Sequence, residues 1–144
     1  MGVWSNHVLE SDLKAERNVP CGEYDVVITD IERRSSKSNP NSQYCLVVFG
    51  MIAGGEVPGI FLHDDMHTGD ASKDAWLHKK ACHMLDDIAS SAGVNLDDFP
   101  DINLDDPVYD AATRLIGYTI HVQVVDNPKL NGGKETIPIV PEGI

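Results

Sequence analysis

The chain has 144 residues, of which 42% are hydrophobic and 24% charged, as expected for one globular domain with one core. Its 11 basic and 23 acidic residues give a net charge of −12. This balance excludes a basic double-helix binder of the histone or repressor kind, whose surface must be positive overall. No apolar run reaches about 18 residues, so we expect no membrane-spanning helix and no membrane partner.

Residues 1–18 are polar and predict an amino-terminal arm, ahead of a single domain over residues 19–144. At the start of that domain, Tyr24, Val26 and Ile28 occupy every second position and share one face, which is typical of a half-buried strand. A Ser/Asn/Pro-rich loop separates this strand from an almost continuous apolar run. The first half of the domain therefore predicts three strands, over residues 23–31, 44–52 and 57–63.

A helix follows, with Asp70 or Ser72 as its amino-terminal cap and Gly93 as its stop. Apolar residues recur between these points at three- and four-residue spacing. Residues 94–113 read as an acidic connector. Alternation resumes over residues 116–125, and a last edge-like strand is expected over residues 136–140, interrupted by Pro138.

The predicted fold class is mainly β with one helix. Three strands, a helix and two strands are the element order of the OB-fold, a five-stranded antiparallel barrel with its helix between strands three and four. A generic α+β sheet with one helix on its face is the alternative, because element order alone does not fix a topology.

Five of the 11 basic residues flank or occupy two loops, which in an OB-like barrel frame the oligonucleotide face. These candidate phosphate-binding residues are Arg33, Arg34, Lys37, Lys129 and Lys134. Carboxylates gather elsewhere, over residues 86–110. A net-negative protein can bind a polyanion when its cations line one groove. The alternative is that polar loops hold these cations by chance.

Bases of a single strand also need flat side chains on which to stack. Tyr44 and Phe49 lie on one predicted strand with opposite parity, so only one of them faces outward. We favour Tyr44, because it directly follows the first loop, and keep Phe61 as a further candidate. Tyr24 and Tyr118 alternate with Val and Ile and are expected to be buried.

The sequence carries no motif for catalysis. Phosphate-loop, dinucleotide, nucleophile-elbow and zinc-protease patterns are all missing. His63 and His67 lie at a strand end, and His78 with Cys82 would supply two metal ligands rather than four. We therefore expect no enzyme, no catalytic residue, no metal and no cofactor. Three widely spaced cysteines argue against a disulfide-stapled secreted domain and for a reducing, intracellular setting.

Residues 19–28 read VPCGEYDVVI and resemble the P-x-G-x-Y-x-V-x-I opening of a family of small phage-encoded proteins. That family is catalogued as a domain of unknown function and regarded as single-stranded-DNA-binding. The likeness continues through Gly54-Gly55, the helix end at residues 88–94 and the strand at residues 115–125. It implies an accessory to replication or recombination that acts in the cytoplasm of a bacterial host cell and has no catalytic residues.

The first functional hypothesis is thus a sequence-tolerant single-stranded-DNA-binding protein. The alternative is an acidic inhibitor or adaptor that mimics a nucleic acid and occupies the basic groove of a host or phage enzyme. The acidic residues 86–110 would recruit replication or recombination proteins. A homo-oligomer that pairs through its last strand is a third hypothesis.

Overall fold

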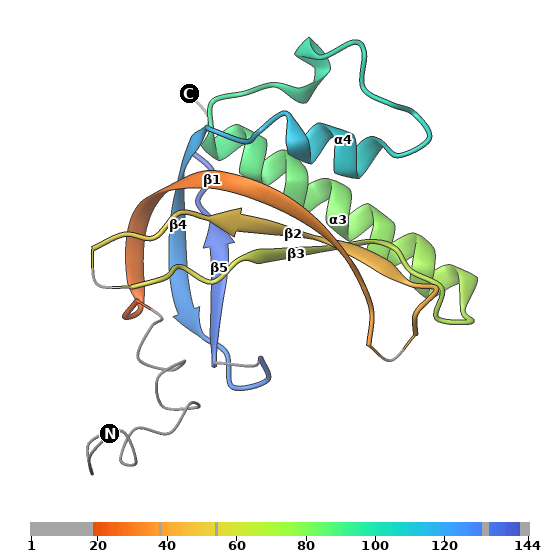
Figure 1. The fold of residues 1–144 in the computed structure, drawn as a ribbon, viewed down its shortest axis with the longest axis horizontal. Coiled ribbons are helices and arrows are strands. Elements are labelled where there is room, and N and C mark those ends of the chain that lie inside the picture. Colours follow the sequence, from red (N-terminus) through yellow and green to blue (C-terminus); the bar gives the residue numbers. More distant parts are fainter. Residues whose placement is uncertain (1–18, 38, 54, 131–132, 142–144) are drawn as a thin grey trace, which may run out of the picture.

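The computed structural model describes residues 19–37, 39–53, 55–130 and 133–141. The predicted arm at residues 1–18 lies outside them. The described chain is mainly β: five antiparallel strands form one curled sheet, a half-barrel, and two α-helices lie against it (Figure 1). No helix in this part of the chain has the length and apolar character needed to cross a membrane.

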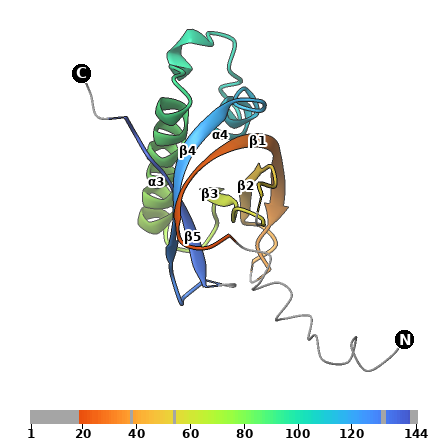
Figure 2. The same cartoon turned by 90° about the vertical axis from the view of Figure 1, so that its left-hand side faces the viewer.

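The first strand, β1 (Gly22–Ser35), joins the two halves of the sheet. Its first part pairs with β4 (Thr119–Asp126) and its second part with β2 (Gln43–Phe49). A β-bulge between Ile28 and Asp30 lies where the partner changes, and bulges bend and twist a strand. Figure 2 shows β1 arching over the interior as a result. The strand is longer than predicted, because the polar residues 32–35 pair with residues 43–46.

The sheet order is β3-β2-β1-β4-β5, so β3 (Ile60–Asp65) and β5 (Lys134–Pro138) are its edges. Three hydrogen bonds connect β5, the segment before β1 and the segment before β3. Thr136 Oγ1 donates to the Pro58 carbonyl at 2.6 Å, and Lys134 Nζ donates to the Val19 carbonyl at 2.7 Å. The Val19 amide in turn donates to the Glu56 carbonyl at 3.0 Å. Side-chain and loop contacts thus span the gap that no strand ladder closes.

Helix α3 (Ala71–Ser91) forms where the apolar spacing predicts it. Asp70 is its cap: Oδ1 accepts from the backbone N–H groups of Ser72 at 2.9 Å and Lys73 at 3.2 Å. Gly93, with φ +74°, takes the left-handed conformation that ends the helix. Its inner face, which includes Leu85 and Ile88, is buried in the core with β1, β2 and β4 residues.

The prediction of a single helix is wrong, because the acidic connector also folds into helical structure. It forms a 3₁₀ turn, η1 (Leu96–Asp98), and a second helix, α4 (Pro107–Thr113). Pro107 opens α4 at a position where no backbone N–H is needed. Val108, Ala111 and Ala112 then share one buried face at i, i+3 and i+4. This pattern is short and surrounded by carboxylates, so it was not recognised as a helix from the sequence.

The start of the fourth strand also differs from the prediction. Gly117 has φ +95°, and its amide donates to the Ile28 carbonyl at 2.7 Å, so the chain turns there and β4 begins only at Thr119. Ile116 and Tyr118 are consequently 42% and 39% exposed. The expectation that Tyr118 is buried is therefore wrong.

Candidate nucleic-acid interface

An aromatic cluster, Tyr44 on β2 with Phe61 and His63 on β3, lies on the outer face of the sheet. The ring centroids of Tyr44 and Phe61 are 5.4 Å apart, with the planes inclined by 63°. His63 lies 5.5 Å from Tyr44 and 6.1 Å from Phe61. Edge-on and offset contacts of this kind are favoured between aromatic rings. Phe61 is 45% exposed, so the cluster presents ring surface to solvent.

Strand alternation produces this arrangement. Cys45 and Val47 on β2 and Leu62 on β3 are buried in the core, so the residues between them face outward. Phe49 shares the parity of the buried residues and is only 7% exposed. Of the two rings predicted as alternatives on this strand, Tyr44 is therefore the one on the outer face.

Arg34 lies beside the cluster, because it is the cross-strand partner of Tyr44. Its guanidinium forms an ion pair with Glu32, two residues earlier on the same face of β1. Hydrogen bonding to Glu32 raises the pKa of Arg34, and Tyr44 contributes to the shift. The side chain of Arg34 is still 49% exposed, so a cation borders the rings.

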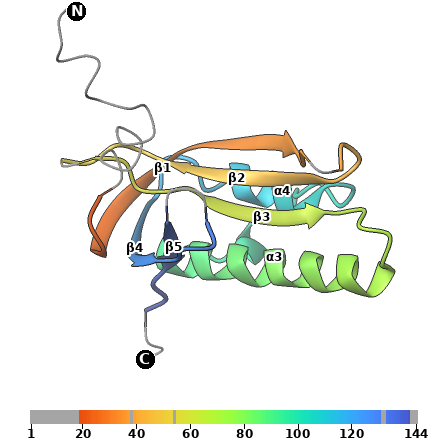
Figure 3. The ribbon, with the colours of Figure 1, turned by 90° about the horizontal axis from the view of Figure 1, so that it is seen from below.

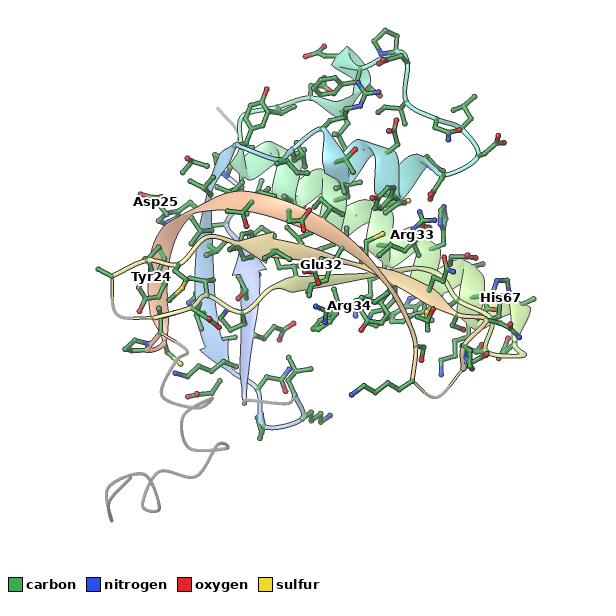
Figure 4. All side chains as sticks on the ribbon, in the orientation of Figure 1. Tyr24, Asp25, Glu32, Arg33, Arg34 and His67 are labelled. Carbon is green, nitrogen blue, oxygen red and sulfur yellow. The ribbon has the colours of Figure 1, made fainter. Side chains whose placement is uncertain are left out.

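Arg33 points to the opposite side of β1 from Arg34 (Figure 4). It forms an ion pair with Asp106, and its guanidinium carbon lies 4.4 Å from the ring centroid of Tyr109 on α4. Burial has the largest single effect and opposes the charge of Arg33, but the hydrogen bond to Asp106 and the charge of that carboxylate, with smaller effects of Cys45 and Tyr109, together raise its pKa. Arg33 thus joins β1 to α4 through Asp106 and Tyr109.

The other three predicted cations lie near the two loops. Lys37 is exposed in the β1–β2 loop and Lys129 in the β4–β5 loop. The two loops project from the same side of the molecule, the lower side in Figures 1 and 2. Lys134 is only partly exposed, because its ammonium group donates to the Val19 carbonyl. Lys37 and Lys129 are therefore the more accessible of the three.

Arginines and lysines differ in their partners. Each of the three arginines in the described ranges forms an ion pair with a carboxylate, whereas no lysine there does. The predicted phosphate-binding residues are accordingly of two kinds. Arg33 and Arg34 are partly neutralised by their neighbours, whereas Lys37 and Lys129 are exposed and the ammonium of Lys134 is bonded to the Val19 carbonyl.

The surroundings of His63 favour its uncharged form. Burial, and then the nearby ammonium of Lys80 on α3, lower its pKa below the ordinary value of 6.5. An uncharged imidazole stacks as a flat ring, so all three members of the cluster are available as stacking surfaces. The sequence did not indicate this role for His63, because the bulge between Gln43 and Cys45 sets the register that brings it beside Tyr44.

A cavity of about 300 Å³ lies near the ends of β2 and β3 that adjoin α3 and α4. Four carboxylates line it, those of Asp64, Asp65, Asp105 and Asp106. Tyr44, Arg33 and His78 also line the cavity, but the four carboxylates would repel a phosphate, so the cavity disfavours a polyanion.

His78 lies beside this cavity and links two elements. Its Nδ1 is 2.5 Å from Asp64 Oδ1, and its Nε2 is 3.6 Å from Cys82 Sγ. Burial and the carboxylates of Asp64 and Asp86 raise the pKa of the Cys82 thiol. The thiol therefore stays protonated, whereas a cysteine nucleophile acts as the thiolate. No group of three or more metal-ligating side chains is found among the described residues.

The sequence matches no protein-family model and no curated protein. The resemblance to the phage family therefore stays a prediction, and the surface is described by its geometry: an exposed aromatic cluster, one arginine at its border and lysines in the flanking loops.

Proposed function

We propose that the chain binds single-stranded DNA on the outer face of β1, β2 and β3, as a sequence-tolerant accessory to phage replication or recombination. The observation that carries the proposal is the aromatic cluster with Arg34 at its border. Stacking of a base on an aromatic side chain contributes about 1–3 kcal/mol and tolerates any base. Nearby cations hold the phosphates, so affinity should fall steeply with salt.

We further propose that the half-barrel is an OB-like barrel. The strand order, with β1 shared between β2 and β4, supports this assignment. In OB-folds, oligonucleotides bind to the face of strands two and three and to the loops that join strands one to two and four to five. In this chain that face carries Tyr44 and Phe61, and those loops carry Lys37 and Lys129.

Fluorescence anisotropy of a labelled oligo(dT) tests the proposed function. The double variant Tyr44→Ala with Phe61→Ala should raise Kd by about tenfold or more, because it removes two stacking surfaces. Tyr118→Ala is the matched control, since it removes an exposed ring outside the cluster. Unchanged affinity in the double variant, with its thermal unfolding intact, would overturn the proposal.

A second candidate function rests on the acidic segment between α3 and α4. Figure 1 shows this segment at the top of the molecule, on the side opposite the two basic loops. Leu104 lies 88% exposed in it, between Asp101 and Asp105. An acidic surface with an exposed leucine suits a basic protein partner. A chain that fails to bind oligo(dT) but co-purifies with a basic nuclease or helicase would favour this function.

A further inference from the structure

Helix α3 exposes an aromatic and basic stripe, Lys73, Trp76 and Lys80. These residues are spaced by three and four positions, so they share one face of a helix that turns every 3.6 residues. Trp76 is 57% exposed, and Lys80 Nζ lies 5.2 Å from the centroid of its ring. The core does not use this tryptophan, because the buried face of α3 is formed by Ala81, Leu85, Ile88 and Ala89.

The stripe continues the aromatic cluster. Figure 3 shows β1, β2, β3 and α3 in a row, with α3 next to β3. Lys80 connects the two surfaces: its ammonium acts electrostatically on His63 and lies over the ring of Trp76. The elements that carry these rings thus follow one another: Tyr44 is on β2, Phe61 and His63 are on β3, and Trp76 is on α3.

The charges on this half of α3 favour a polyanion. Lys73, Lys79 and Lys80 are exposed, and none of them forms an ion pair with a described residue. The two carboxylates at the start of the helix have local partners: Asp70 caps the helix, and Asp74 accepts hydrogen bonds from Thr68.

We propose that a single-stranded polynucleotide bound at the aromatic cluster crosses β3 and continues onto α3, where a base stacks on Trp76 and lysines 73 and 80 hold phosphates. This inference rests on the proposed function and extends its binding surface beyond the strands and loops. Lys80 covers part of the indole ring, and the base stacks on the part that remains exposed. Binding along this path requires a longer oligonucleotide than binding at the aromatic cluster alone.

The test compares short and long oligo(dT), within the range of about 4–16 nucleotides that OB-folds bind. Trp76→Ala should weaken binding of the long oligomer by about tenfold and leave the short one unchanged. Trp76→Phe should keep most of the affinity, because it keeps a ring. The chain has two tryptophans, so in a Trp4→Phe background emission comes from Trp76 alone and should be quenched by the long oligomer.

Each outcome decides the matter. If the wild-type chain binds no oligomer, the proposed function fails and this inference fails with it. If binding depends on Tyr44 and Phe61 but Trp76→Ala binds long oligomers normally, only this inference is overturned. A Trp76→Ala variant that keeps its oligomer affinity but loses self-association would instead assign the stripe to a contact between copies of the chain.

Discussion

At the scale of single residues, arginine and lysine differ in whether they pair with the carboxylates of this protein. A guanidinium group has a planar fork that matches a carboxylate, whereas an ammonium group is a compact, well-hydrated charge. Arg33 and Arg114 accordingly pair with carboxylates of the segment between α3 and β4, and Arg34 pairs with Glu32. In the sequence Arg33 and Lys37 look equivalent. The partner that separates their roles, Asp106, lies 73 residues from Arg33 along the chain.

His121 provides a pH-dependent contact between β1 and β4. Its Nδ1 lies 2.7 Å from Asp25 Oδ1, and its Nε2 lies 3.5 Å from Glu23 Oε1. The hydrogen bond to Asp25 raises the pKa of His121 above 6.5. A group whose pKa is higher in the folded than in the unfolded chain stabilises the fold. The stabilisation is complete at pH values below the pKa of the unfolded chain, and it is lost as the pH rises through the pKa of the folded chain.

We therefore expect His121→Gln to lower the free energy of unfolding at pH about 5.5 and to have little effect at pH about 8.5. Urea unfolding at both pH values measures the difference. Asp25→Asn should reproduce the effect at the lower pH, because it removes the main partner. An equal loss of stability at both pH values would show that the charge of His121 does not contribute.

At the scale of elements, local patterns located most strands and α3, and long-range contacts decided the boundaries. Alternation and capping residues identify β1 and α3 without any tertiary information. The end of β1 could not be foreseen, because residues 32–35 are polar and become a strand only by pairing with β2. Likewise, α4 is short, and burial of its face against the core is what makes it a helix.

Gly59 permits the close approach of the segment before β3 to β2. A Cβ atom at this position would lie 2.6 Å from the Val47 carbonyl oxygen and 2.7 Å from Leu46 Cδ1. The carbonyl belongs to the backbone of a central strand and cannot move easily. Gly59→Ala should therefore lower the free energy of unfolding by about 1–3 kcal/mol, as measured by urea denaturation.

Gly50→Ala is the matched control, because its Cβ would lie 3.3 Å from Thr29 Cγ2, a methyl group of an exposed side chain rather than a backbone atom. Equal stabilities of the Gly59→Ala and Gly50→Ala variants would contradict the steric argument.

At the scale of the whole molecule, the loop lysines are separated from the acidic segment, whereas Arg33 and Arg114 pair with its carboxylates. The loops with Lys37 and Lys129 project from one side, and the acidic segment before α4 lies on the other. The sequence predicted that Arg33 lies with these lysines and away from the acidic residues, but Arg33 forms an ion pair with Asp106 of the acidic segment. It could not predict that Phe61 and His63 join Tyr44, because cross-strand register places them together, nor that α3, which carries Trp76, lies next to β3.

Reversing both loop charges, Lys37→Glu with Lys129→Glu, should raise the Kd for oligo(dT) by at least about tenfold at low salt. The slope of log affinity against log salt should fall in magnitude by about 1.4, since each phosphate contact on a single strand contributes about 0.7. Anisotropy titrations at several salt concentrations measure both quantities.

Asp97→Lys with Asp98→Lys is the control, because it reverses two charges on the acidic side. If affinity follows net charge alone, this control tightens binding by a similar factor. If the loops contact the phosphates, it changes binding little, so an equal and opposite response of the two variants would contradict the loop assignment.

Because β1 forms hydrogen bonds with β2 along one stretch and with β4 along another, neither half of the sheet can melt without loosening the strand that anchors the other. The molecule should therefore denature as one cooperative unit rather than in stages. A ligand held by β2 and β3 would consequently protect the distant β4–β5 hairpin against heat, without touching it.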